Sequence, residues 1–514
     1  MRTAKPGESN GFNFYLPDTE MDKMRRPSDS ETIFDVAVIG GGVVGCAVVR
    51  ELSRYDLKLL LLEKEADLAE GVSKANSGVI HAGFNVSPGS LKARTNVEGL
   101  GRIYELAVEL GVPHRRTGKL VVALGDEDRP RLEELKAQGD RNGVPGLEIV
   151  DEAAISRLAP GVLGRWALFS PWSGIISPYE FTIALAECAA RNGARVMLEA
   201  PVVAIECRPD GFLLTTPRGS FMVRRVVNAA GLFADEVAAL AGIADYRVYP
   251  YRGEYLITDK EAGAVLSMPV YPVPPRDDSF LGVHITPTVE GNILLGPSSD
   301  AVEDKRDTAT TRAVMAQLKS EALTLVPELG RFPFIHSFAG LRPKLTDPQG
   351  RVKLVDFVIE ESRVRPGWIN LLGIESPGLT AAPAIAARVA EMIGARENWR
   401  EKSEFEATRE PAPRFAHLSD TERAGRVAGD ARWGEMVCRC EHVTRAEVET
   451  ALRNPFGVKT LDGLKRRTRC GMGRCQGGFC TPRIVEIMQK EGLPLAGMTK
   501  RGGGSDLFKG RLKS

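Results

Sequence analysis

One glycine-rich turn constrains the fold of this chain more than any other feature, and it reads Gly40-x-Gly42-x-x-Gly45. A β-prone run precedes the turn, and a stretch with helical spacing of its apolar residues follows it. The next apolar run ends at Glu63. This order, a strand, a glycine turn, a helix and a second strand that ends in an acid, predicts a βαβ unit over residues 34–63 that binds a dinucleotide.

Each residue of this motif has a physical task. Gly40 permits the tight turn, Gly42 lets the backbone approach a pyrophosphate, and Gly45 lets the helix pack closely on the sheet. The first turn of the helix offers free N–H groups and the positive end of its dipole to the phosphates. We expect Glu63 to accept hydrogen bonds from the adenosine ribose. The turn alone does not distinguish FAD from NAD.

Two later segments favour FAD. Asn228-Ala-Ala-Gly231 ends a β-prone run with small residues, which let a second stretch of backbone approach the same cofactor. Gly373-Ile-Glu-Ser-Pro-Gly-Leu-Thr380 precedes an Ala-rich helix. The N-terminus of that helix would stabilise negative charge on a reduced flavin ring.

Five of the eight cysteines lie near the end of the chain. Cys438-x-Cys440 is followed by Cys475-x4-Cys480, and four thiolates from two short loops suit a [2Fe–2S] cluster or a tetrahedral zinc ion. Zinc sites more often use Cys-x2-Cys spacing, whereas the Cys-x-Cys spacing and the glycines beside Cys475 favour the cluster. Such glycines leave backbone N–H groups free to reach sulfur.

Composition narrows the class of protein. Lys and Arg together number 68 and Asp and Glu 67, a net charge of +1, which gives no reason to expect a nucleic acid partner. The best apolar run, 57–62, is far shorter than the roughly 20 residues that span a membrane. Residues 1–30 lack the apolar core of a signal peptide. We therefore expect a cytoplasmic protein that makes any membrane contact through a partner.

Length and patterning suggest how the chain is divided, since 514 residues correspond to about three domains. We expect an α/β fold in which a Rossmann-like FAD-binding domain carries an antiparallel β-sheet substrate domain, followed by a small helical [2Fe–2S] domain. The expected boundaries are 1–32 for a flexible arm, 33–398 for the oxidoreductase, 399–432 for a linker, 433–490 for the [2Fe–2S] domain and 491–514 for a basic tail. We expect residues 498–514 of that tail to be mobile. Within the oxidoreductase, the FAD-binding segments are about 33–90, 180–245 and 335–398, and the substrate domain takes about 91–179 and 246–334.

Several motifs resemble known families. Over roughly residues 34–396 the chain is similar to the D-amino-acid-oxidase-like FAD-dependent oxidoreductases. Four segments of the chain resemble the L-2-hydroxyglutarate dehydrogenase branch of that family. They are Asn76-Ser-Gly-Val-Ile-His-Ala-Gly83, Pro88-Gly-Ser-Leu-Lys92, Arg252-Gly-Glu-Tyr255 and Gly282-Val-His284. The C-terminal module resembles the bacterioferritin-associated-ferredoxin-like domain of the anaerobic glycerol-3-phosphate dehydrogenase large subunit. That likeness rests on Cys438-Arg-Cys440 and Arg467-Thr-Arg-Cys-Gly-Met-Gly-Arg-Cys-Gln-Gly-Gly-Phe-Cys480.

The resemblance implies a set of cofactor contacts. Besides the glycine turn and Glu63, the expected FAD-binding residues are Ser77, Gly78, Val202, Ala230, Gly231, Gly373, Gly378, Leu379 and Thr380. It also implies that Cys438, Cys440, Cys475 and Cys480 hold the cluster while Cys470, a fifth cysteine, does not.

The reaction that the resemblance implies is oxidation of a secondary alcohol or amine, with hydride passing to the flavin while a base takes the hydroxyl proton. A base should titrate near neutral pH, which suits His81 or His284. An anionic substrate needs a fixed cation, and a guanidinium binds carboxylate or phosphate at two points. Arg342 is the first candidate for that role, and Arg252 and Lys344 are second choices.

The leading hypothesis is an FAD- and [2Fe–2S]-containing dehydrogenase of a small anionic hydroxy compound, with glycerol-3-phosphate first and L-2-hydroxyglutarate or another 2-hydroxy acid next. The cluster would pass electrons singly to a partner redox subunit or carrier. An amine or opine substrate is a further alternative, and so is an electron-transfer subunit whose own substrate site has decayed.

Overall fold

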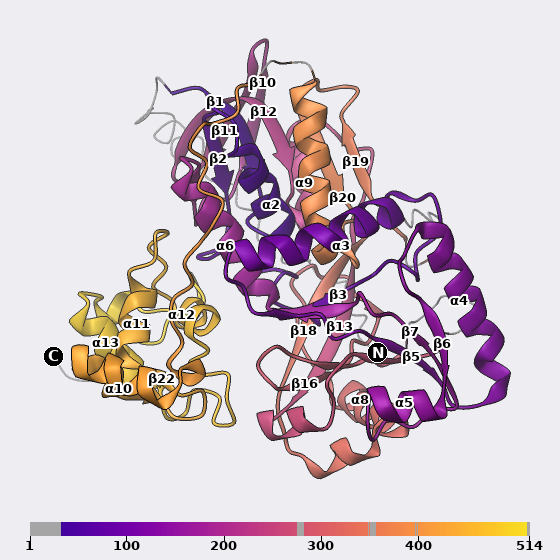
Figure 1. The fold of residues 1–514 in the computed structure, drawn as a ribbon. Coiled ribbons are helices and arrows are strands. Elements are labelled where there is room, and N and C mark those ends of the chain that lie inside the picture. The colour runs from indigo at the N-terminus through magenta and orange to yellow at the C-terminus, as the bar shows by residue number, and fades with distance from the viewer. Residues whose placement is uncertain are drawn as a thin grey trace, which may run out of the picture.

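The structure is a computed structural model that describes residues 32–274, 282–347, 349, 356–395, 397 and 399–510. In Figure 1 an α/β body lies above a second body built on a large sheet, and a small helical module, coloured orange to yellow, lies beside them. The predicted N-terminal arm, 1–32, falls outside the described residues except for its last position.

The α/β body is built on an eight-stranded sheet. Strand β1 pairs in parallel with β2 and with β12, so that Ile39 stands beside both Leu62 and Asn228. Because the carboxyl ends of these strands meet at one edge, the glycine turn, Glu63 and Asn228 are brought together there. The strands are β1 (Phe34–Ile39), β2 (Leu59–Leu62), β9 (Arg195–Met197), β10 (Ala204–Arg208), β11 (Gly211–Thr216), β12 (Gly219–Asn228), β19 (Val358–Glu361) and β20 (Trp368–Leu372).

A layer of helices covers one face of this sheet. Helix α2 packs on α6 and α9, and α9 packs on α3. The side chains of β2 are all buried, as is usual for a parallel strand covered on both faces. These helices are α2 (Val43–Leu52), α3 (Leu91–Glu109), α6 (Pro178–Arg191) and α9 (Gly378–Gly394), while α7 (Ala234–Leu240) follows β12.

The second body contains a nine-stranded sheet that is mainly antiparallel, as expected for a substrate domain, with β14 and β5 as a parallel pair. Its strands are β5 (Leu120–Ala123), β6 (Glu148–Asp151), β7 (Trp166–Phe169), β13 (Tyr249–Thr258), β14 (Val270–Pro272), β15 (Ile285–Pro287), β16 (Ile293–Leu295), β17 (Asp300–Ala301) and β18 (Phe334–Lys344). Its helices are α4 (Arg129–Asn142), α5 (Glu152–Leu158) and α8 (Arg312–Leu325). A separate three-stranded sheet has the order β3 (Val79–Ile80), β8 (Gly174–Ile176) and β4 (His114–Arg115). Figure 1 shows β3 between the two bodies.

The C-terminal module has a hydrophobic core of its own. It consists of β21 (Met436–Cys438), β22 (Val443–Thr444), α11 (Arg445–Leu452), α12 (Leu461–Thr468) and α13 (Thr481–Lys490). Residues 498–510 correct the expectation of a mobile tail, because the fully buried Met498 belongs to this core together with Leu493. The backbone also continues the module, since Leu461 N donates to Thr499 O. Residues 511–514 lie outside the described part.

The segment predicted as a linker, 399–432, lies against the α/β body along part of its length. Lys402 N donates to Arg54 O at 2.8 Å, and Arg409 N donates to Glu109 O at 2.9 Å. The segment then forms α10 (Asp420–Gly429), which has a complete capping box. Figure 1 shows it running down the side of the α/β body to the C-terminal module.

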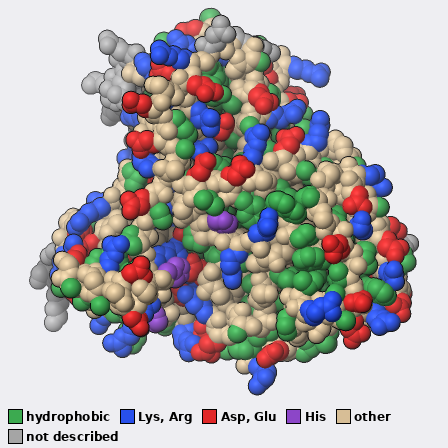
Figure 2. All heavy atoms as spheres, in the orientation of Figure 1, with side chains coloured by type: hydrophobic (Ala, Val, Ile, Leu, Met, Phe, Trp, Pro, Cys, Tyr) green, Lys and Arg blue, Asp and Glu red, His purple; other side chains and the backbone are tan. Residues whose placement is uncertain are grey.

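The visible surface mixes charges of both signs. In Figure 2 Lys and Arg side chains are interspersed with Asp and Glu, in keeping with the net charge of +1. No helix among the described residues is long and apolar enough to cross a membrane.

Candidate functional site

The glycine turn between β1 and α2 has the close contacts that its sequence predicts. Gly40 has φ +115°, and a Cβ atom there would lie 2.4 Å from the carbonyl oxygen of Ala229. A Cβ atom on Gly45 would lie 2.0 Å from the carbonyl oxygen of Gly40. Only glycines allow this approach of β1, α2 and the end of β12. Gly42 is the N-cap of α2, so the helix begins where a phosphate is expected.

Glu63 lies at the end of β2 and contacts the glycine turn. Its carboxylate accepts hydrogen bonds from Gly41 N at 2.6 Å and from Glu65 N at 2.9 Å. Burial raises the pKa of Glu63 above its ordinary value, and these two N–H donors oppose that shift. Ala200 N donates to Glu63 O, which brings the loop that carries Val202 to the same edge of the sheet. Glu63 is therefore fixed beside the turn, where the ribose of a dinucleotide would lie.

Two more predicted segments meet at the N-terminus of α9. Thr380, in the first turn of α9, accepts a hydrogen bond from His81 N at 2.9 Å through its hydroxyl. Gly378 and Leu379 open the same helix, and Gly373 lies in the turn after β20. At the end of β12, Gly231 has φ +56° with open space where a side chain would lie. Ser77 and Gly78 directly precede β3, and Ala230 N donates weakly to Asn228 Oδ1 at 3.4 Å.

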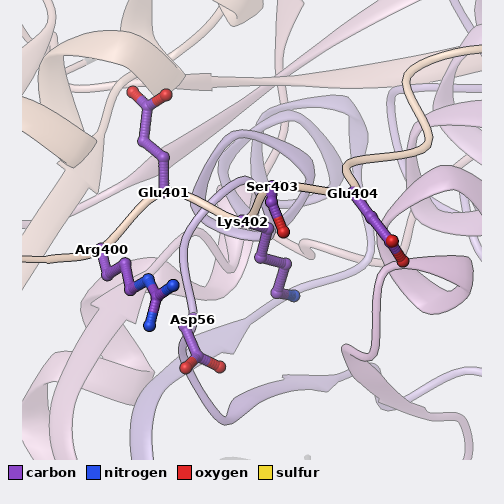
Figure 3. Close-up of a pocket in the computed structure, with 6 residues that line it drawn as sticks. All are labelled: Asp56, Arg400, Glu401, Lys402, Ser403 and Glu404. Carbon is purple, nitrogen blue, oxygen red and sulfur yellow. The ribbon is translucent and has the colours of Figure 1, made fainter.

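The pocket drawn in Figure 3 lies away from this cradle. It has a volume of about 240 Å³ and is lined by Asp56 and by residues 400–404 of the linker segment. Asp56 follows the C-terminal end of α2, whereas the glycine turn lies at its N-terminal end, about 15 Å along the helix. Its lining side chains are all polar, so we assign it no part in the chemistry.

One face of the β13–β18 pair carries the predicted cation Arg342. The guanidinium Nη2 donates to Ser298 O at 3.0 Å, while the buried Nη1 has no hydrogen-bond partner among the described residues. A Cβ atom on Gly253 would lie 2.8 Å from Nη2, so this glycine makes room for the guanidinium. A Cβ atom on Gly340 would lie 2.1 Å from Ala75 O, which places the segment before Ser77 against the same strands.

The two other predicted substrate-binding cations, Lys344 and Arg252, lie on different faces of the sheet. Lys344 is two residues from Arg342 on β18 and shares its face, with Nζ 4.7 Å from the Tyr251 ring centroid. Burial and nearby cations lower the pKa of Lys344. Arg252 pairs with Leu341, so it points to the other face of the sheet, where it forms ion pairs with Asp307 and Glu254. This corrects the expectation that Arg252 binds substrate, since its charge is already neutralised.

His81 lies between the cofactor segments and the large sheet. Its Nε2 is 3.5 Å from Ser376 Oγ, and its carbonyl oxygen accepts a hydrogen bond from Asn96 Nδ2 at 3.0 Å. Burial, assisted by the charge of Lys119, lowers the pKa of His81 to about 3. This corrects the expectation of a base that titrates near neutral pH. The imidazole is neutral at pH 7, so it can accept a proton, but it is weakly basic in the absence of substrate.

His284 directly precedes β15 and is buried. Its ring stacks on that of Tyr271, with centroids 3.4 Å apart and planes 4° from parallel. Tyr271 in turn faces Lys119, whose Nζ lies 4.4 Å from the ring centroid. The two predicted histidines are thus linked through Tyr271 and Lys119. Neither of these was predicted from the sequence, although Lys119 is a charged residue directly before a fully apolar strand.

The four predicted cysteine ligands lie in one small region. Cys440 Sγ and Cys475 Sγ are 3.7 Å apart, close to the distance of about 3.8 Å between two sulfurs on one tetrahedral metal with bonds of about 2.3 Å. Cys438 contacts Cys480, and backbone N–H groups of Gly471 and Gly477 approach the sulfurs of Cys438 and Cys475. Paired sulfurs with N–H donors around them fit a binuclear iron–sulfur cluster.

Cys470 lies beside this set, buried and in contact with both Cys438 and Cys480. Its omission from the ligand set remains a prediction. It follows α12 directly, whereas Cys475 and Cys480 lie in the loop that leads into α13.

Contacts join the cysteine module to the cofactor cradle. Ile176 N donates to Gly78 O at 2.9 Å, and three residues further on Tyr179 Oη donates to Met472 Sδ at 3.7 Å. Arg469 reaches the same tyrosine, at 3.3 Å from Nη1 to Oη. The cysteine loop therefore contacts Tyr179, which lies close in sequence to the strand that is hydrogen-bonded to Gly78, a residue expected to contact the dinucleotide.

A buried ion pair network fixes the module in this position. Asp67, fully buried after β2, accepts hydrogen bonds from Arg466 Nη2 at 2.7 Å and from Arg467 Nη1 at 2.7 Å and Nη2 at 2.9 Å. Arg466 also pairs with Glu70. Burial alone would raise the pKa of Asp67, but the two guanidinium groups lower it below its ordinary value.

We expect Asp67→Asn to weaken docking of the module by about 3 kcal/mol, because it leaves two buried guanidinium groups short of a counter-charge. Limited proteolysis should cleave the 399–432 segment faster, while the exposed Asp420→Asn serves as control. A carboxylate whose pKa is lower in the folded than in the unfolded protein stabilises the folded form at any pH above its unfolded pKa. This stabilisation is lost only as the pH falls from the unfolded pKa through the lower pKa of the folded form. The effect should therefore be constant from pH 5 to 8. Proteolysis at the wild-type rate would contradict this role.

Comparison with known proteins places these features in two families. The profile described as "FAD dependent oxidoreductase" matches residues 35–392, and that described as "BFD-like [2Fe-2S] binding domain" matches residues 436–490. A protein named glycerol 3-phosphate dehydrogenase from Caloramator mitchellensis is 39% identical over 486 residues, covering 94% of this chain and 99% of that protein.

Two further relatives match the oxidoreductase part. A mitochondrial L-2-hydroxyglutarate dehydrogenase of Caenorhabditis elegans is 33% identical, covering 69% of this chain and 92% of the relative. The solved structure of dithionite-reduced L-alpha-glycerophosphate oxidase from Mycoplasma pneumoniae, with FAD bound, superposes with a TM-score of 0.68 at 31% identity, covering 74% of this chain and all of that one.

Proposed function

Because this chain belongs to the FAD dependent oxidoreductase family and carries a BFD-like [2Fe–2S] binding domain, we propose that it is a dehydrogenase that oxidises glycerol-3-phosphate to dihydroxyacetone phosphate and passes the electrons through its cluster. Its cofactors are FAD and a [2Fe–2S] cluster. The relative that matches nearly the whole chain, including the cysteine module, is named for this substrate.

The observation that best supports the proposal is that one buried nitrogen of Arg342 lacks a hydrogen-bond partner among the described residues. Its Nη1 is buried and has no partner among the described residues, and a buried guanidinium donor is costly unless an acceptor completes it. A phosphate or carboxylate oxygen is the acceptor that a guanidinium prefers. Lys344 adds a second positive charge on the same face of the sheet.

The remaining side chains suit oxidation of a secondary alcohol. FAD, when bound, takes the hydride from the carbinol carbon, and the cluster passes the electrons on one at a time. We assign the hydroxyl proton to neutral His81, whose Nε2 lies 3.5 Å from Ser376 Oγ and whose backbone N–H binds Thr380 in the first turn of α9. Binding of an anion beside Lys119 would offset the charge that depresses the pKa of His81, and so would make the imidazole more basic once substrate is present.

The cysteine module supports transfer to a partner redox subunit or a diffusible carrier. Tyr179 and Met472 connect the segment at Gly78 with the cysteine loop. Cys440 and Cys475 are partly exposed, whereas Cys438 and Cys480 are buried in the core of the module. A cluster held by these cysteines would therefore have its outer edge at Cys440 and Cys475. A one-electron acceptor could approach that outer edge.

A second candidate substrate is L-2-hydroxyglutarate or another 2-hydroxy acid. The segment around His81 resembles that branch, and a relative named for L-2-hydroxyglutarate matches the oxidoreductase part at 33% identity. Reduction of the bound flavin by each compound without oxygen tests the two directly.

We expect Arg342→Ala to raise KM for the anionic substrate about 100-fold, since a hydrogen bond between buried charged groups contributes about 3 kcal/mol and each 1.4 kcal/mol is tenfold. Steady-state kinetics with the preferred substrate measure this. Arg331→Ala is the control, because that side chain is 80% exposed and pairs only with Glu328 among the described residues. An unchanged KM in Arg342→Ala would remove Arg342 from the site.

A further inference from the structure

Lys119 is a buried cation in an aromatic setting. It directly precedes β5 and is 3% exposed. Its Nζ lies 4.4 Å from the ring centroid of Phe84 and 4.4 Å from that of Tyr271. Aromatic faces attract an ammonium group, but they do not replace its hydration shell.

No carboxylate of the described residues neutralises this ammonium group. Among the described residues Nζ forms neither an ion pair nor a hydrogen bond, and burial lowers the pKa of Lys119 to about 7. Buried lysines are nearly always paired with an acid. Lys119 is therefore a buried cation without a counter-charge among the described residues, and an anionic ligand could supply one.

The position of Lys119 identifies that anion. Its charge acts on His81, which contacts the N-terminal turn of α9 through Thr380. Tyr271, on the other side of the ammonium group, stacks on His284. Lys119 thus lies near His81, to which we assign the substrate proton, and it is connected to His284 through the Tyr271 ring.

We propose that Lys119 is a substrate-anchoring residue, whose ammonium group pairs with the phosphate or carboxylate of the substrate and shares that anion with Arg342. The proposal rests on the proposed function, because it names a further residue of the same site. A phosphate dianion carries two charges, and the Arg342 guanidinium neutralises one of them. Lys119 would neutralise the second, in addition to the positive charge that Lys344 places on the Arg342 face of the sheet.

The anchoring role has a consequence for pH. The groups that face Lys119 are His81, which is neutral above about pH 4, and Tyr271, whose pKa burial raises. Neither changes charge between pH 6 and 8. The phosphate itself gains its second charge over about pH 6 to 7.5, so Lys119 would govern anion binding above that range. Because only the ammonium form binds the anion, the dissociation constant should rise up to about tenfold per pH unit above pH 7.

The experiment compares the full-length enzyme with Lys119→Met and Lys119→Arg, each loaded with both cofactors. Calorimetry measures binding of inorganic phosphate from pH 6 to 8.5, and anaerobic kinetics measure KM and kcat with glycerol-3-phosphate and with L-2-hydroxyglutarate. We expect Lys119→Met to weaken phosphate binding and raise KM about 30-fold, with kcat within about fivefold of wild type. Lys119→Arg should keep KM within about tenfold and abolish the pH dependence above pH 7, since a guanidinium does not titrate there.

Lys319→Met is the matched control, because Lys319 also lies over an aromatic ring, that of Phe334, but is exposed. Phosphate binding and KM unchanged in Lys119→Met would overturn the inference, and so would a fall in kcat with unchanged KM, which indicates proton transfer instead. If Lys119→Met does not retain FAD, the pH dependence of phosphate binding in Lys119→Arg decides. If no compound reduces the wild-type flavin, the proposed function fails, while the phosphate titrations still test Lys119.

Discussion

Replacing His81 by asparagine is expected to lower kcat about 10²- to 10⁴-fold while FAD remains bound, because a positioned general base contributes a factor of this size. The backbone N–H of residue 81 would still donate to Thr380 Oγ1, so the cradle should remain intact. Rapid mixing with substrate in the absence of oxygen measures the rate of flavin reduction. The exposed His417→Asn provides a control.

The pH profile adds a second test of His81. Burial and Lys119 hold the pKa of His81 near 3, so the basic form is present throughout pH 5–8 and is lost only as pH falls toward that value. Apart from the ionisation of the substrate itself, the pH profile of kcat/KM should therefore have no acidic limb near pH 6.5, where an unperturbed histidine titrates. Flavin reduction by His81→Asn within about fivefold of the wild-type rate would contradict the assignment of a base.

Loss of one cluster ligand should separate reduction of the flavin by substrate from transfer of electrons to an external acceptor. We expect Cys475→Ser to abolish the bound iron and its visible absorbance, because Cys475 lies 3.7 Å from Cys440 in a pair that fits one iron atom. Substrate should still reduce the flavin, whereas turnover with a one-electron acceptor should fall at least about 100-fold. Iron analysis, absorbance and the two rates measure these effects.

Two matched variants sharpen that test. Cys470→Ser should retain about two irons for each chain, since we place Cys470 outside the ligand set, and Cys207→Ser, at an exposed position, should behave as wild type. Full cluster content in Cys475→Ser would contradict the ligand assignment. Loss of the cluster in Cys470→Ser would show that the buried fifth cysteine is a ligand.

The cofactor regions could be predicted because their determinants are local in sequence. A glycine turn with a fixed spacing, followed by an acid at the next strand end, specifies how β1, α2 and β2 meet. The cysteine spacing has the same property, because each pair comes from one short loop. These features need no knowledge of which distant strands become neighbours.

The substrate face was only partly predictable, because it depends on strand register and on long-range contacts. Arg252 and Arg342 lie in adjacent strands, but Arg252 pairs with Leu341, so the two arginines point to opposite faces. The low pKa of His81 depends on burial and on Lys119, 38 positions away in the sequence. The C-terminal residues join the module core through Leu493 and Met498, and the basic composition of the tail gave no sign of these contacts.

The account depends on delivery of electrons from a small anionic alcohol to FAD and then to the cluster. The most direct measurement is an anaerobic titration of the purified holoenzyme with glycerol-3-phosphate, 2-hydroxy acids and amines, followed by absorbance and by electron paramagnetic resonance. The account predicts bleaching of the flavin by glycerol-3-phosphate at low concentration, accompanied by the signal of a reduced [2Fe–2S] cluster. A flavin that no hydroxy compound bleaches, but that an amine or a partner protein reduces, would contradict it.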